Sequence, residues 1–291
     1  MESWDIAGSS QRLPVSVLTG FLGSGKTTVL NYLIQQPALS RTLVLINEFG
    51  EIGLDHELVE SSSEGMVLLR SGCLCCTIRG DLIDTLRSLF LRRVKGEISE
   101  FNRVIIETTG LADPAPILHT LMTEPLIAAR YRLDGVIATV DAVNGGDALD
   151  RQIESVKQAA MADRLLITKT DLVDSAVLLG LQCRLRGLNP AAPQVTAHNG
   201  AVDPALLFDA GLYDPKTKSL DVQGWLRAEA YAESHGHTHQ HNDVNRHDAH
   251  IKAVCLTLDE PLHGDALDLW IEALLLIRGA NLLRVKGIVN V

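Results

Sequence analysis

The fold of this chain is decided by the sequence Val15-Ser-Val-Leu-Thr-Gly20-Phe-Leu-Gly-Ser-Gly-Lys26-Thr-Thr28. A strand-like apolar run leads into Gly-x-x-x-x-Gly-Lys-Thr, the phosphate-loop pattern, and a helix is expected to follow over 26–35. Glycines let such a loop wrap a phosphate with its backbone amides, at the positive N-terminal end of the helix. The stretch therefore predicts a site for a nucleoside triphosphate.

Individual residues of this site have separate expected roles. Lys26 can reach the β- and γ-phosphates, and the Thr27 hydroxyl can bind Mg²⁺. The apolar run Val-Ile-Ile leads into Glu107, which can hold Mg²⁺ through water unless it is only a strand-terminal carboxylate that faces solvent. The amide of Gly110 can meet the γ-phosphate. We expect catalysis to depend on Lys26, Thr27 and Glu107, and nucleotide binding to include Gly20, Gly23, Ser24, Gly25 and Thr28.

A base-reading element is expected after a later strand. The sequence Thr168-Lys169-Thr170-Asp171 resembles the Asn-Lys-x-Asp motif of GTPases, with threonine in the asparagine position. Asp171 can accept hydrogen bonds from N1 and the exocyclic N2 of guanine, a pairing that adenine cannot offer, and the stem of Lys169 can cover the base. Thr168 offers a single hydroxyl, whereas the asparagine of the motif would offer an amide with a separate donor and acceptor. The alternative for Asp171 is a helix N-cap. The stretch 196–200 is a weaker candidate for completing the base pocket through backbone amides.

Apolar runs alternate with helical patterns over the first 200 residues. Strands are expected over 14–19, 42–46, 66–69, 103–107, 136–141, 164–168 and 194–196. Further helices are expected over 80–93, 153–161 and 176–188. The alternation indicates an α/β fold with a mainly parallel P-loop NTPase sheet flanked by helices.

The pattern changes in the last third of the chain. Polar sequence ends in alternating histidines, and it is followed by a β-type run over 250–258, an amphipathic helix around Trp270 and a strand-like run over 282–291. We therefore expect three parts: a GTPase domain over 1–210, a flexible His-rich linker over 211–249 and the start of a small, truncated C-terminal α+β domain over 250–291.

Charge and cysteine usage exclude several classes of protein. The 291 residues carry a formal net charge of -10, which argues against a surface built to grip nucleic acid. No apolar run approaches the roughly 18 residues that span a bilayer, and the first residues do not resemble a secretory signal. Three crowded cysteines fit a reducing compartment. We expect a cytoplasmic protein without a nucleic-acid or membrane partner.

The crowded cysteines also suggest a metal site. Cys73, Cys75 and Cys76 can form a soft thiolate chelate for Zn²⁺ or Cu⁺, with a fourth ligand from elsewhere. A disulfide cycle and simple packing are the alternatives. Weaker metal binding is expected on a flexible arm, for which a solvated linker is the alternative; its ligands would be His235, His237, His239 and His241.

Four motifs together resemble the CobW family of metallochaperone GTPases. They are the phosphate loop, Asn47-Glu-Phe-Gly50, Gly72-Cys-Leu-Cys-Cys76 and Glu107-Thr-Thr-Gly-Leu-Ala-Asp-Pro114. The resemblance implies slow, Mg²⁺-dependent GTP hydrolysis coupled to delivery of zinc, or cobalt, to a client metalloprotein. It also places a metal-responsive loop over 47–55, where Glu48, Glu51 or Asp55 can bind Mg²⁺ or complete the thiolate set.

Two other functions use the same motifs. A P-loop kinase would share the phosphate loop, and a metal store or sensor would use the nucleotide only structurally. The sequence is compatible both with a monomer and with a nucleotide- or metal-dependent homodimer.

Overall fold

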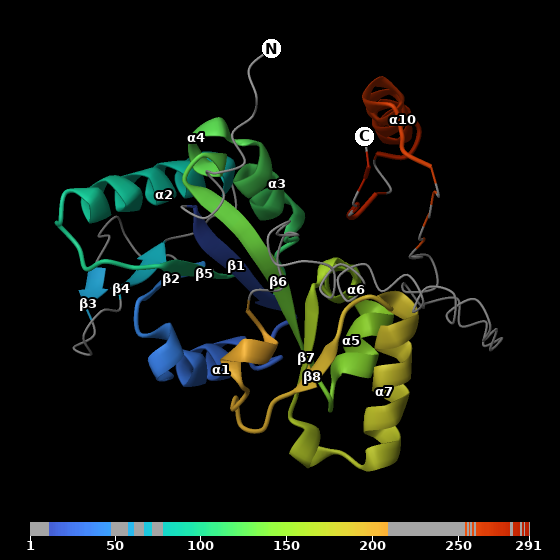
Figure 1. Cartoon of the computed structure of the whole chain (residues 1–291). Coiled ribbons are helices and arrows are strands. Elements are labelled where there is room, and N and C mark those ends of the chain that lie inside the picture. The colour runs from blue at the N-terminus through green and yellow to red at the C-terminus, as the bar shows by residue number, and fades with distance from the viewer. Residues whose placement is uncertain are drawn as a thin grey trace.

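A single eight-stranded sheet forms the centre of the molecule in the computed structural model (Figure 1). The structure describes residues 12–47, 58–60, 67–71 and 78–208, and in the C-terminal part 254, 256, 258, 260–279, 282–285, 287, 289 and 290. The strands follow the order β3-β4-β2-β5-β1-β6-β7-β8. Their bounds are Leu13–Gly20 (β1), Thr42–Asn47 (β2), Leu58–Glu60 (β3), Val67–Ser71 (β4), Arg103–Glu107 (β5), Tyr131–Asp141 (β6), Arg164–Thr168 (β7) and Gln194–Thr196 (β8).

All described strand pairs are parallel except that between β3 and β4, which is antiparallel. The carboxyl ends of the seven parallel strands therefore lie at one edge of the sheet, where open α/β sheets bind their ligands. The predicted α/β fold with a mainly parallel sheet is confirmed.

Helices cover both faces of this sheet. They are α1 (Lys26–Leu33), α2 (Ile78–Val94), α3 (Ala115–Thr123), α4 (Pro125–Ala128), α5 (Gly145–Arg151), α6 (Ile153–Met161) and α7 (Ser175–Leu188), with short 3-10 helices η2 (Pro37–Leu39), η3 (Thr170–Leu172) and η4 (Pro204–Leu206). Alternate strand residues point to opposite faces. On β6, Val136 packs with α2, α3 and α4, and Ala138 and Val140 pack with α5, α6 and α7. Ile137 faces the other way and packs with α1.

Most elements that the sequence predicts are present, and four strands and α-helices are new besides the short 3-10 helices. These are β3, α3, α4 and α5. Pro114 precedes α3 and Pro116 lies in its first turn, where proline is compatible with a helix because its missing N–H has no intrahelical partner. β6 also begins at Tyr131, five residues before the predicted start at 136.

The C-terminal part differs from its prediction. The expected helix is α10 (Gly264–Arg278), but none of the described residues within 250–258 and 282–291 belongs to a strand. Short strands need neighbours to complete a hydrogen-bonded ladder, which explains why β-type sequence alone does not form one here. Arg284 connects this part to the sheet domain, because it donates to the Met161 carbonyl at 2.5 Å and pairs with Asp163 at 2.9 Å. Among the described residues, no helix is both long and apolar enough to cross a membrane.

Candidate nucleotide-binding site

The phosphate loop joins β1 to α1 at the carboxyl edge of the sheet. Gly25 is the residue before the helix, and its φ of 90° lies in the left-handed region that favours glycine. The amide of Val29 donates to the Gly25 carbonyl at 3.0 Å, which closes the first turn of α1. The sequence therefore begins the helix at Lys26, as predicted.

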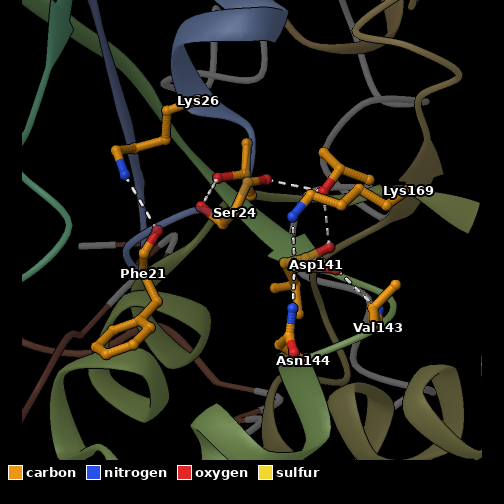
Figure 2. A network of polar contacts seen from close by, with 10 residues as sticks. Phe21, Ser24, Lys26, Asp141, Val143, Asn144 and Lys169 are labelled. Atoms are coloured by element: carbon orange, nitrogen blue, oxygen red, sulfur yellow. Dashed lines mark hydrogen bonds and ion pairs between the residues drawn. The ribbon is translucent and has the colours of Figure 1, made fainter.

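Lys26 points back into its own loop. Its Nζ donates to the Gly20 carbonyl at 2.9 Å and to the Phe21 carbonyl at 3.1 Å, and Figure 2 shows the second contact. Lys26 is 9% exposed. Burial lowers the pKa of Lys26, and the negative charge of Glu107 partly offsets that effect. The negative charge of a phosphate bound in this loop would stabilise the ammonium and so oppose the effect of burial on the pKa of Lys26.

Thr27 and Glu107 meet although 80 positions separate them in the sequence. The Thr27 hydroxyl donates to Glu107 Oε1 at 2.9 Å, and Glu107 is 4% exposed at the end of β5. A hydroxyl and a carboxylate are hard oxygen ligands of the kind that Mg²⁺ prefers. The pair fits a magnesium site beside the phosphate loop, and the solvent-facing alternative for Glu107 is wrong.

The loop after β5 lies against β1 and the phosphate loop. The Thr108 amide donates to the Leu18 carbonyl of β1 at 2.9 Å. A Cβ on Gly110 would lie 2.6 Å from the backbone nitrogen of Leu22 in the phosphate loop. Only a glycine allows this approach, so Gly110 lies beside the loop as the sequence predicts. From α6, the Gln158 side chain donates to the carbonyls of Gly110 at 3.1 Å and Ala112 at 3.0 Å.

Thr168 is directed to the phosphate loop. It ends β7, is 4% exposed, and its hydroxyl donates to the Ser24 carbonyl at 2.7 Å. The hydroxyl of Ser24 in turn lies 2.6 Å from that of Thr139 on β6. These contacts join the phosphate loop to two strands of the sheet.

The next residues present a charged surface for a base. Lys169 has a left-handed backbone with φ 56°, and its Nζ lies 2.6 Å from Asp141 Oδ2. Asp171 is exposed within η3. The N-cap alternative for Asp171 is wrong, because Lys169 holds that position before η3 and Asp174 holds it before α7.

The Asp141 carboxylate holds the ammonium of Lys169, and no sequence motif identifies Asp141 as a residue of the site. It also accepts from the Val143 amide at 2.8 Å and Asn144 Nδ2 at 2.9 Å (Figure 2). Burial alone would raise the pKa of Asp141, but the hydrogen bonds from Lys169, Asn144 and Val143 outweigh it and hold the pKa below its usual range. The carboxylate therefore remains charged and keeps the stem of Lys169 in place.

The turn after β8 lies against α1. A Cβ on Gly200 would fall 2.7 Å from the carbonyl oxygen of Thr28, and Ala201 and His198 exchange backbone hydrogen bonds of 2.8 and 3.2 Å. This turn is thus close to the start of α1, and its role in completing the base pocket stays a prediction.

The predicted metal ligands lie outside the described residues. These are Cys73, Cys75, Cys76, Glu48, His235, His237, His239 and His241, and the described part of the chain contains no other group of three metal-binding side chains. The sheet register shows where the strands that precede Glu48 and the cysteines in the sequence end. On β2, Ile46 pairs with Glu107 and Asn47 pairs with Ser71 of β4. The two strands β2 and β4 therefore end at the edge of the sheet that carries Glu107.

The fold and this loop define a P-loop domain that binds a nucleoside triphosphate. This domain combines a strand and a glycine loop with a buried lysine at a helix N-terminus and the Thr27–Glu107 pair. More narrowly, the chain belongs to the CobW/HypB/UreG family, since the model of that family's nucleotide-binding domain matches residues 14–196.

Several relatives extend the match beyond this domain. The chain is 35% identical to the zinc chaperone YjiA of Escherichia coli over 94% of this chain and 81% of YjiA. It is 33% identical to the zinc-regulated GTPase metalloprotein activator 1 of Schizosaccharomyces pombe, over 66% of this chain and 47% of that protein. The crystal structure of Zn(II)-bound YjiA GTPase from E. coli superimposes with a TM-score of 0.65 at 31% identity, covering 92% of this chain and 79% of the other. The predicted family resemblance is confirmed.

Proposed function

We propose that this chain is a GTP-hydrolysing metallochaperone that binds zinc and transfers it to a client metalloprotein in a nucleotide-dependent way. The observation that carries the proposal is the sheet edge at which the Thr27–Glu107 pair meets the two strands leading to Glu48 and the cysteines. The names of relatives as zinc chaperones and zinc-regulated GTPases support the choice of zinc and GTP.

In this proposal, hydrolysis depends on the side chains of Lys26, Thr27 and Glu107. The ammonium of Lys26 neutralises the β- and γ-phosphates, and Thr27 and Glu107 would hold Mg²⁺. When bound, the metal supplies positive charge to the phosphate oxygens. No arginine finger can be identified from the sequence, so intrinsic turnover is expected to be slow.

Zinc is the cargo, with cobalt as the second choice. The thiolates of Cys73, Cys75 and Cys76 form the tight site, with Glu48 as the candidate fourth ligand. His235, His237, His239 and His241 collect metal weakly. Because the strands β2 and β4, which precede Glu48 and the cysteines in the sequence, end beside the nucleotide site, we expect metal affinity and nucleotide state to be coupled, and the coupling to be reciprocal.

The remaining parts of the proposal concern organisation. We assign 1–210 to the GTPase domain, 211–249 to the His-rich linker and 250–291 to a C-terminal domain. The protein acts in the cytoplasm without nucleic acid, as a monomer or as a nucleotide- or metal-dependent homodimer.

Base selectivity tests the GTP assignment. Asp171 accepts from guanine, so GTP is expected to bind at least about tenfold more tightly than ATP, a difference near 1.4 kcal/mol. Asp171→Asn reverses the hydrogen-bond sense at the 2-position and should favour the xanthine nucleotide. Calorimetric titration with the three nucleotides measures this order. Equal affinities for GTP and ATP in the wild-type chain would refute the assignment, and a phosphorylated small-molecule product would favour the kinase.

The anchor of Lys169 gives a second prediction. Asp141→Asn removes the charge that holds Lys169 Nζ, so GTP binding is expected to weaken by roughly fivefold, about 1 kcal/mol. The ion pair's full contribution to folding stability is present above the ordinary pKa of 3.8 and is lost as the pH falls through the lowered pKa of Asp141.

The matched control is Asp147→Asn on α5, whose side chain is 62% exposed and pairs with Arg151. Calorimetry should give this variant wild-type affinity. If both variants bind GTP like the wild type, Asp141 does not position the lysine.

A further inference from the structure

The Thr168 hydroxyl has a single hydrogen to donate, and it donates this hydrogen bond to the phosphate loop. Thr168 Oγ1 lies 2.7 Å from the Ser24 carbonyl oxygen and 3.4 Å from that of Val140, so the shorter contact fixes the donor direction. The group is buried between β7 and the loop. A hydroxyl has a single donor hydrogen, so this one cannot serve a second acceptor at the same time.

A second threonine, Thr139 on β6, contacts the same loop residue through its hydroxyl. The Thr139 hydroxyl donates to the Thr19 carbonyl at 3.2 Å, which leaves the Ser24 hydroxyl as the donor in its 2.6 Å contact with Thr139. Ser24 is therefore held by its carbonyl from β7 and by its side chain from β6. Its backbone belongs to the loop that wraps the phosphates, so these contacts preorganise the loop before a nucleotide binds.

The guanine base has edges with different requirements. N7 carries a lone pair and needs a hydrogen-bond donor, whereas N1–H and the N2 amino group need acceptors. Asp171 supplies an acceptor from the exposed end of the same loop. The backbone amides of Ala197, His198 and Ala201 in the adjacent turn already donate to backbone carbonyls.

We propose that Thr168 positions the phosphate loop and does not read the base, so that this chain recognises guanine without a hydrogen bond to N7. The inference rests on the proposed GTP binding and specifies how the site achieves it. Asp171 reads the Watson–Crick edge, and Lys169, anchored by Asp141, covers the base face. Thr168, which stands in the position of the motif's asparagine, thus uses its single hydroxyl hydrogen on the Ser24 carbonyl.

The test compares GTP with 7-deaza-GTP, in which a C–H group replaces N7. Both are titrated into the full chain with Mg²⁺, with ATP as the specificity reference. We expect the two guanine nucleotides to bind within about twofold of each other, because the loss of the N7 acceptor breaks no hydrogen bond to the protein, while ATP binds at least about tenfold more weakly. If 7-deaza-GTP binds tenfold more weakly than GTP although GTP is preferred over ATP, this inference is wrong and the proposed function stands. If GTP and ATP bind equally, the proposed guanine recognition fails, and the inference fails with it.

Variants at Thr168 test its positioning role. Thr168→Val removes the hydroxyl at similar volume and leaves the Ser24 carbonyl without its donor, so GTP and 7-deaza-GTP should both weaken by about tenfold. Thr168→Ser restores the hydroxyl and should restore both affinities. The matched control is Thr42→Val at the start of β2, because the buried Thr42 hydroxyl has no hydrogen-bond partner; this variant should bind both nucleotides like the wild type.

The two nucleotides and two proteins form a double-mutant cycle. Equal losses on both nucleotides give no coupling between Thr168 and N7, as expected. A loss on GTP alone would show that the hydroxyl reads N7 and would overturn the inference, as would unchanged binding of both nucleotides. If Thr168→Val fails to fold in thermal melting, the wild-type comparison of GTP with 7-deaza-GTP still decides.

Discussion

Replacing Lys26 with methionine is expected to reduce GTP turnover by roughly a thousandfold, on the order of 4 kcal/mol in transition-state free energy. Methionine keeps an unbranched stem but removes the buried ammonium that donates to Gly20 and Phe21. Among the described residues, Lys26 is the cationic side chain that donates to these two loop carbonyls, so its loss removes the positive charge from the phosphate loop. Phosphate release under saturating GTP measures the loss.

The same variant should not destabilise the nucleotide-free protein. Burial lowers the pKa of Lys26, which means that the folded loop disfavours the charged form. Removing the buried charge is favourable, whereas losing the hydrogen bonds to the Gly20 and Phe21 carbonyls is unfavourable, so the melting temperature without nucleotide should change little, which would separate function from folding. Lys95→Met is the control, because Lys95 is 65% exposed and pairs only at the surface with Glu97. A large fall in the melting temperature of Lys26→Met, with turnover retained, would contradict the assigned role.

Replacing Cys75 and Cys76 with serine is expected to abolish stoichiometric, tight zinc binding. Two of the three proposed thiolate ligands are lost, whereas the phosphate loop, Glu107 and Asp171 are untouched, so GTP binding should stay within about threefold. Zinc competition against a chromogenic chelator measures the metal affinity. Metal-dependent stimulation of hydrolysis should disappear in the same variant.

Two controls separate this site from other ligands. Cys183→Ser changes an exposed cysteine on α7 and should leave zinc binding intact. Substituting His235, His237, His239 and His241 by alanine should remove only weak equivalents, which the wild type loses as the pH falls through about 6.5. Tight zinc retained in the double cysteine variant would show that the cysteines are not the site.

The parts of the site that the sequence predicts are those whose chemistry is local. The phosphate loop places its lysine and threonine within one turn of sequence, and Glu107 follows an apolar strand directly. Alternating strands and helices predict that these ends meet at one edge. The 2.9 Å contact between Thr27 and Glu107 is the result.

The parts that the sequence does not predict come from neighbours across the sheet. Asp141, Thr139 and Gln158 have ordinary sequence surroundings, and their importance arises from strand order and helix packing. Thr168 is a different case, since the sequence identifies it as a departure from the base-reading motif. Only the structure identifies the Ser24 carbonyl as the acceptor of its proton.

Zinc affinity is expected to depend on which nucleotide the protein holds. The zinc affinity of the full chain is measured with Mg²⁺ and saturating GDP, and again with a GTP analogue that resists hydrolysis. We expect zinc to bind at least about tenfold more tightly with the GTP analogue, and zinc to tighten binding of that analogue by the same factor. Identical zinc affinities in the two nucleotide states would contradict the claim and leave a GTPase that merely carries a metal.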